Sequence, residues 1–352
     1  MSPFDQRLAA LNDWNPPKEW LQITTIDAHT GGEPLRIITS GLPLLEGNTI
    51  LEKRRYLKRN LDHLRKALMW EPRGHADMYG CIVTEPTSEK NADFGVIFLH
   101  NEGYSSMCGH GIIAITKVAV ELGLVPLLEP VTKLTIEAPA GLITSYARVN
   151  QGRVSSVSFE NVPSFVLYRD QVVSVEGLGE VLLDIVYGGA FYAYVDADKI
   201  GLGMAEINYR LLIEKGMAIK KTVMDKLEIK HPFEEDLSFL YGTIFYGKGY
   251  SEGTDSRNVC IFADGEVDRS PTGTGVSGRV ALHYAQGRLS IGQPMVIESI
   301  VGSRFVAKVK QETTFGPYRA VIPEVEGRAH ICGKNTFLID PDDALGQGFF
   351  LR

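Results

Sequence analysis

The stretch MCGHG at residues 107–111 recurs as PTGTG at residues 271–275, 164 positions further along the chain. The two copies align Gly109 with Gly273, and an apolar segment of helical character follows each of them. Each copy predicts a sharp glycine turn that opens a helix. The residue before the first glycine is Cys108 in one copy and Thr272 in the other, so a reactive thiol has an inert hydroxyl as its counterpart.

The duplication extends beyond these two turns. Upstream, the apolar residues 96–99 correspond to residues 259–262, and downstream KLTIEAPAGLITSYARV corresponds to PMVIESIVGSRFVAKV at an offset of 161. Alternating β-branched runs that are interrupted by a glycine predict strands. A repeat of this size predicts two similar domains rather than an array of short repeats. A site between the two domains would have Cys108 and Thr272 on opposite sides of one bound molecule.

The length of 352 residues is sufficient for two domains that each bury a core. We place the boundary at the polar segment 161–164 and expect the tail, with its apolar run 336–339, to pair back onto the first half. The first domain is therefore expected to span residues 18–160 plus 335–352, and the second residues 161–334.

Helical periodicity predicts helices over residues 51–69 and about 204–227. The first of these carries five basic residues, which we expect to form a solvated helix face. They are Lys53, Arg54, Arg55, Lys58 and Arg59.

The charge balance points to a small-molecule ligand. Lysine and arginine number 36 against 43 acidic residues, and the net charge of −7 argues against nucleic acid or an anionic membrane as the partner. The N-terminal residues lack a targeting pattern, and the most apolar helix, residues 111–125, is too short to span a membrane. We therefore expect a soluble, cytoplasmic protein.

The chain has four cysteines, and their spacing shows neither a disulfide framework nor a CxxC pair. Cys81 and Cys260 lie in apolar runs and are expected in the core, whereas Cys108 lies at a helix start. A free thiol with a pKa of about 8.5 is only partly ionised at neutral pH, and a helix N-terminus is expected to lower the pKa of Cys108. The same turn could hold a substrate carboxylate with its N–H groups. Thr272 is too weakly acidic to act as a base without an activating partner.

A dinucleotide site is one competing interpretation. Residues 273–278 fit GxGxxG, residues 109–114 fit its GxGxxA variant, and Glu298 follows at about the required distance. However, residues 268–271 separate the second turn from its strand, and a single cofactor does not need two such turns. The pattern therefore favours this interpretation only weakly.

A cysteine hydrolase and a metal site are two further alternatives. Cys108 with His29 or His283 could form an acyl-transfer pair, although no local signature supports the pairing. No HxxxH, HExxH or CxxC spacing occurs, so no metal site is expected.

Five motifs together resemble the proline racemase family, and they cover nearly the whole chain. They are DAHTGGEPLRII (27–38), EPRGHADMYG (71–80), MCGHG (107–111), GGAFYA (188–193) and DRSPTGTG (268–275). The resemblance implies an α/β (α+β) fold of two pseudo-symmetric halves, each a strongly curved sheet around a central helix, as in diaminopimelate epimerase. It implies no cofactor, an amino-acid substrate and a possible homodimer.

Racemases of this family carry a cysteine in both half-sites, one for each face of the substrate's α-carbon. Thr272 replaces the second cysteine here, which resembles the branch that dehydrates trans-3-hydroxy-L-proline to pyrroline-2-carboxylate. In that substrate the α-hydrogen and the hydroxyl lie on the same face of the ring, so one base on one face is enough. Racemisation or epimerisation of proline or 4-hydroxyproline is the alternative activity.

The resemblance also assigns roles to residues that match the family motifs. Gly109, His110, Gly273 and Thr274 fall on the turns that hold the carboxylate, and Asp268 falls on the partner of the ring ammonium. Tyr79 and Phe262 fall on aromatic walls of the pocket. We expect His110 to act through its backbone more than its side chain. A core role for Phe262 and a turn-capping role for Asp268 stay open.

Overall fold

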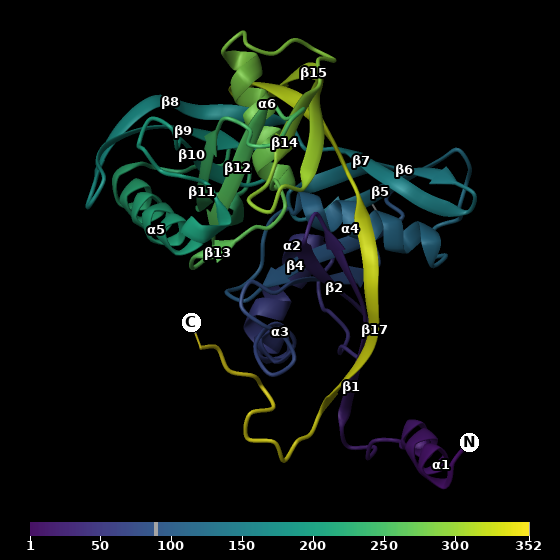
Figure 1. Cartoon of the computed structure of the whole chain (residues 1–352). Helices are drawn as coiled ribbons and strands as arrows, with labels where there is room; N and C mark the ends of the chain where they lie inside the picture. The colour runs from purple at the N-terminus through teal and green to yellow at the C-terminus, as the bar shows by residue number, and fades with distance from the viewer. Residues whose placement is uncertain (88–90, 352) are drawn as a thin grey trace.

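The computed structural model describes residues 1–87 and 91–351 (Figure 1). A short N-terminal segment precedes the first half and contains α1 (Pro3–Ala10) and the 3₁₀ turn η1 (Leu11–Asp13). The first half then consists of β1 (Leu21–Thr30), β2 (Glu33–Ser40), α2 (Ile50–Tyr56), the π-helical turn η2 (Leu57–Leu61), α3 (Asp62–Met69), β3 (Tyr79–Thr84), β4 (Phe94–His100), α4 (Gly109–Glu121), β5 (Val131–Ala138), β6 (Gly141–Asn150) and β7 (Arg153–Glu160).

The second half is built from a similar but longer series of elements. They are β8 (Ser164–Val175), β9 (Gly179–Tyr187), β10 (Phe191–Asp196), η3 (Glu206–Asn208), α5 (Tyr209–Lys226), η4 (Glu235–Leu237), β11 (Leu240–Gly247), β12 (Ser256–Phe262), β13 (Glu266–Val267), α6 (Gly273–Ala285), β14 (Met295–Glu298), β15 (Arg304–Phe315), β16 (Tyr318–Gly327) and β17 (Ala329–Ile339).

Strand pairing makes the duplication explicit. In the first half, β1–β2 and β3–β4 are antiparallel, β2–β3 and β4–β5 are parallel, and β5–β6 is antiparallel. In the second half, β9–β10, β10–β11, β11–β12, β12–β14 and β14–β15 show the same directions in the same order. The expected two pseudo-symmetric α/β halves are therefore confirmed.

Each half folds around one buried helix. α4 contacts β1, β6, β7 and β17, whereas α6 contacts β8, β9, β15 and β16 (Figure 1). Almost every residue of both helices is buried, as expected for a helix that the sheet surrounds on most sides. Residues such as Ile112 and Val276 are completely inaccessible to solvent, so the apolar sequence after each glycine turn forms the centre of each half.

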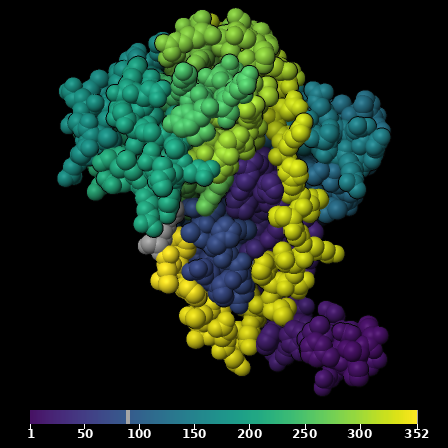
Figure 2. All heavy atoms as spheres, viewed as in Figure 1, coloured from purple at the N-terminus to yellow at the C-terminus, as the bar shows by residue number. Residues whose placement is uncertain are grey.

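Two contacts join the halves into one continuous sheet. β16 pairs with β7 from Glu324 opposite Glu160 to Gly327 opposite Val157. β17 then crosses to the first half and pairs with β1, from Ala329 opposite Thr30 to Ile339 opposite Leu21. Figure 2 shows this yellow C-terminal segment lying across the purple and blue residues of the first half. The tail thus pairs back as expected, although its crossing begins at Ala329, inside the range that we had given to the second domain.

The predicted helices are found with small shifts. The one over residues 51–69 is interrupted by the π-helical turn η2, and the one near residues 204–227 is α5. Among the described residues, no helix is long and apolar enough to cross a membrane.

Candidate active site

The N-termini of α4 and α6 meet backbone to backbone between the two halves. A Cβ added to Gly109 would lie 2.5 Å from Gly273 Cα, and one added to Gly273 would lie 2.6 Å from Gly109 Cα. Real Cβ atoms do not approach other atoms so closely, so only glycine fits at both positions. The two turns of the sequence repeat therefore face each other, and their N–H groups point towards a common site.

One small cavity lies at this junction, with a volume of about 20 Å³. All nine residues predicted for the site line it: Tyr79, Cys108, Gly109, His110, Phe262, Asp268, Thr272, Gly273 and Thr274. Four residues that the sequence did not indicate line it too, namely Met107, Tyr192, Tyr241 and Cys260. Cys260 is fully buried, as expected for a core residue, yet it also borders the cavity.

Cys108 is the N-cap residue of α4. Its Sγ accepts a hydrogen bond from Gly111 N at 3.3 Å, which favours the thiolate. Burial nevertheless raises the pKa of Cys108 well above its usual value, with the nearby Asp268 adding to the rise. The expected lowering by the helix N-terminus is therefore outweighed, and burial favours the thiol form of Cys108.

The imidazole of His110 lies beside that thiol. His110 Nδ1 lies 3.2 Å from Cys108 Sγ, and Nε2 lies 3.3 Å from the carbonyl oxygen of Pro34. Because a carbonyl oxygen can only accept, Nε2 carries the proton and Nδ1 is left as an acceptor for the S–H group of Cys108. Burial lowers the pKa of His110, which keeps the ring neutral. The side chain of His110 is thus positioned to take the Cys108 proton, a role that we had expected less than a backbone one.

Thr272 occupies the equivalent position before α6, in an unusual conformation. Its φ of 68° lies in the left-handed region, which a β-branched residue rarely adopts. Thr272 Oγ1 is buried and makes no hydrogen bond of ordinary geometry to any residue that the structure describes. It lies close enough to Cys260 to lower the pKa of that thiol, although burial, the larger effect, raises it. Backbone strain and an unsatisfied hydroxyl together mark a functional position.

Asp268 lies on the segment that leads into α6. Its Oδ1 accepts a hydrogen bond from Ser270 N at 2.7 Å, so the turn-capping role exists, and the side chain also lines the cavity. The next residue, Arg269, is held by the first half: its backbone N donates to Glu33 Oε2 at 2.7 Å, and its guanidinium pairs with Asp77 at 2.8 Å. Two carboxylates of one half thus fix the position of Asp268 in the other.

Glu33 is a residue that the sequence analysis missed. It is completely buried, and burial followed by the negative charge of Asp268 raises its pKa well above the ordinary value. Its Oε1 makes no hydrogen bond to any described residue. The only available signal was its place within the motif DAHTGGEPLRII, because nothing in that stretch shows that Glu33 reaches the second half.

Aromatic rings close the side of the cavity opposite the helices. Tyr79 and Phe262 come from different halves, with ring centroids 6.1 Å apart, and Tyr241 stacks on Phe262 at 5.4 Å. The hydroxyl of Tyr192 lies 2.7 Å from Thr274 Oγ1. These rings exclude water from the cavity and strengthen electrostatic interactions inside it.

The competing interpretations find no support in this geometry. The backbone contact between Gly109 and Gly273 leaves no room for a pyrophosphate between the two turns, and Glu298 forms an ion pair with Arg257 at 3.0 Å. Neither His29 nor His283 lines the cavity that contains Cys108. Within residues 1–87 and 91–351, no group of three or more potential ligands could hold a metal ion.

The two halves share one fold, and the N-termini of their central helices face each other beside a single thiol. This arrangement is typical of pseudo-symmetric enzymes of the racemase and epimerase type. The family model described as proline racemase matches residues 25–350, and the chain belongs to that family.

Named relatives are similar over almost the whole chain. A trans-3-hydroxy-L-proline dehydratase of Colwellia psychrerythraea is 50% identical, with 99% of this chain and 98% of the relative covered. A 3-hydroxyproline 2-epimerase of Burkholderia multivorans is 49% identical, with 94% and 98% covered. The crystal structure of a hydroxyproline epimerase from Agrobacterium vitis with bound trans-4-hydroxy-L-proline superposes with a TM-score of 0.88 at 32% identity, with 94% and 96% covered. This superposition confirms the predicted fold class.

Proposed function

We propose that this protein is a hydro-lyase that converts trans-3-hydroxy-L-proline into pyrroline-2-carboxylate without a cofactor. The asymmetry between Cys108 and Thr272 carries the proposal, because the site has a thiol on one side of the cavity and a hydroxyl at the mirrored position. A syn elimination needs a base on one face only, whereas inversion needs a proton donor on the other. The name of the Colwellia relative supports the same activity.

The substrate carboxylate would lie between the two helix N-termini. The N–H groups of the turns that begin at Gly109 and Gly273 stabilise its charge as enolate character develops during proton removal. The carboxylate of Asp268 would hold the ring ammonium. These contacts fix the α-carbon between residues 108 and 272, with the aromatic residues Tyr79 and Phe262 excluding water.

Proton transfer would begin within the pair of Cys108 and His110. His110 Nδ1 takes the S–H proton, and the resulting thiolate removes the α-hydrogen of the substrate. The Cα–H electron pair forms the ring double bond as the C3–O bond breaks, and the hydroxyl leaves as water after it receives a proton from the thiol or from the imidazolium. After this transfer one mobile proton remains on Cys108 and His110. When it lies on the sulfur, both the thiol and the imidazole are neutral again. The enamine product then tautomerises to pyrroline-2-carboxylate.

Epimerisation of a hydroxyproline is the second candidate function, because the Burkholderia relative carries that name at nearly the same identity. The replacement of that thiol by a hydroxyl at position 272 disfavours it, since a threonine hydroxyl is too weakly acidic to deliver a proton without an activating partner.

A panel of hydroxyproline isomers separates the two functions. We expect purified protein to form the ketimine from trans-3-hydroxy-L-proline and to leave the optical rotation of trans-4-hydroxy-L-proline unchanged. Inversion of the 3-hydroxy substrate without ketimine formation would replace the dehydratase proposal by the epimerase one. A homodimer and a cytoplasmic location stay predictions from the sequence.

A further inference from the structure

A large charged cleft lies between the two halves, next to the catalytic cavity. Its volume is about 850 Å³, compared with about 20 Å³ for the cavity that contains Cys108. One wall comes from α2 and η2 of the first half, and the opposite wall comes from α5, η4 and β11 of the second half. The ion pair between Arg55 and Asp236, at 2.7 Å, bridges these walls at the surface.

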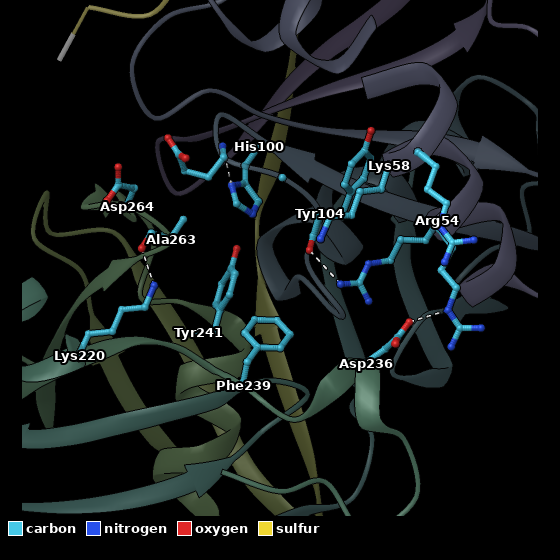
Figure 3. Close-up of a pocket in the computed structure, with 14 residues that line it drawn as sticks. Arg54, Lys58, His100, Tyr104, Lys220, Asp236, Phe239, Tyr241, Ala263 and Asp264 are labelled. Carbon is cyan, nitrogen blue, oxygen red and sulfur yellow. Dashed lines mark hydrogen bonds and ion pairs between the residues drawn. The ribbon is translucent and has the colours of Figure 1, made fainter. Parts of the chain in front are cut away.

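The charges of the cleft are unevenly distributed. Arg54, Arg55, Lys58 and Arg59 line one end together with the carboxylate of Asp236, whereas Glu102 and Asp264 line the other together with Lys220. Figure 3 shows Arg54 and Lys58 on one side and Asp264 on the other, with His100, Tyr241 and Phe239 between them. The basic run of the sequence is therefore the lining of a cleft as well as a solvated helix face. Such a cleft concentrates a small molecule that carries both charges and orients its dipole.

Arg54 differs from its basic neighbours Arg55, Lys58 and Arg59, because it is partly buried. Its Nη2 donates to the carbonyl oxygen of Tyr104 at 3.3 Å, and the guanidinium extends into the cleft in Figure 3. Nη1 is shut off from solvent and has no hydrogen-bond partner in the described part of the chain. A buried guanidinium N–H without an acceptor is costly, so its presence in a folded protein points to a ligand that supplies one. A carboxylate is the acceptor that a guanidinium binds best.

Two tyrosines separate the cleft from the catalytic cavity. Tyr241 lines both spaces, and its hydroxyl lies 3.3 Å from that of Tyr79, which comes from the other half. His100 lines the cleft and stacks on Tyr79 with ring centroids 5.6 Å apart. The catalytic cavity is too small for a five-membered ring with a carboxylate, so the halves must separate at these rings before a substrate can reach Cys108.

We propose that the charged cleft is the entrance to the catalytic cavity, that Arg54 binds the carboxylate of the incoming amino acid there, and that the Tyr79–Tyr241 pair is the gate. The identity of the amino acid rests on the proposed function, whereas the route does not. An entrance residue lowers the barrier between free and bound states without contacting the ligand in its final position. It therefore changes the association and dissociation rates by the same factor.

Stopped-flow binding of pyrrole-2-carboxylate, a planar analogue that cannot be dehydrated, tests the route. In Arg54→Gln we expect both rates to fall about tenfold, the loss expected for one charged hydrogen bond, with an unchanged dissociation constant. Arg54→Lys should keep part of the association rate. Tyr241→Phe removes the hydroxyl contact of the gate and should raise both rates. Arg319→Gln is the matched control, because Arg319 is exposed and pairs with Glu312 on the β15–β16 hairpin, outside the cleft.

The outcomes separate the route from the chemistry. Unchanged rates in a folded Arg54→Gln protein would overturn the entrance, and a change confined to dissociation would place Arg54 in the final site instead. A wild-type protein that binds the analogue by this route but does not dehydrate trans-3-hydroxy-L-proline would contradict only the proposed function.

Discussion

Replacement of Thr272 by cysteine tests the asymmetry of the site directly. The duplicated turns place residue 272 at the start of α6 as Cys108 is placed at the start of α4, and both side chains line the same cavity. Thr272→Cys would therefore add an acidic group on the opposite face of the substrate's α-carbon. We expect it to confer inversion on a proline-type substrate that the parent protein cannot invert.

The fold should tolerate this change. Cysteine lacks the β-branch that strains a residue at a φ of 68°, and the substitution removes a buried hydroxyl that makes no hydrogen bond. Relief of each of these two costs should stabilise the folded protein by about 1–3 kcal/mol. The loss of one buried methyl group costs about 0.8 kcal/mol. The free energy of unfolding should therefore not fall, and the balance of these effects is a gain of about 1–5 kcal/mol. A positioned proton donor contributes about 10²–10⁴-fold to rate, so inversion should rise by at least the lower factor.

The assay is exchange and inversion at Cα in deuterated water, with trans-4-hydroxy-L-proline or proline as substrate because neither can eliminate a 3-hydroxyl. Thr272→Ser is the matched control, since it also removes the branch but adds no acidic group, and it should not invert. A folded Thr272→Cys protein that still dehydrates yet shows no exchange from the opposite face would refute the placement of residue 272. Inversion by the wild-type protein would refute it equally.

Three further predictions concern the remaining site residues. Cys108→Ser should lower the dehydration rate by about 10²–10⁴-fold with an unchanged melting temperature, because it removes the base at a helix start; near-normal turnover would eliminate Cys108 as the base. Asp268→Asn should mainly raise KM for the amino acid and weaken pyrrole-2-carboxylate binding less, because only the former has a ring ammonium; equal losses for both ligands would contradict the pairing. The kcat/KM profile should lose activity on the acid side only, because protonation of His110 removes the acceptor for the Cys108 proton, and this loss should fall below the usual range of a histidine since burial lowers the pKa of His110. An acid limb that persists unshifted in His110→Gln would show that another group causes it.

The side-chain contacts of the site were beyond the reach of the sequence. The pKa of Cys108 was expected to fall because the helix N-terminus is a local feature, whereas burial by residues distant in the chain decides its direction. The Cys108–His110 contact depends on the ring's rotamer and on Pro34, which is 76 residues away. Glu33 was missed because its contact with Arg269 spans 236 residues. The basic residues near Arg54 were interpreted as a solvated face, since only the second half of the chain turns that face into a cleft.

The sequence by itself determined the duplicated architecture and the position of the site. Glycines at 109 and 273 are required by a backbone contact, and the apolar runs after them form the centres of the two halves, so local pattern and global fold agree. The tertiary structure alone decided which side chains meet across the halves, how burial sets the protonation of Cys108 and His110, and where a substrate can enter. These properties depend on distances between segments far apart in the chain, and no local sequence pattern encodes such distances.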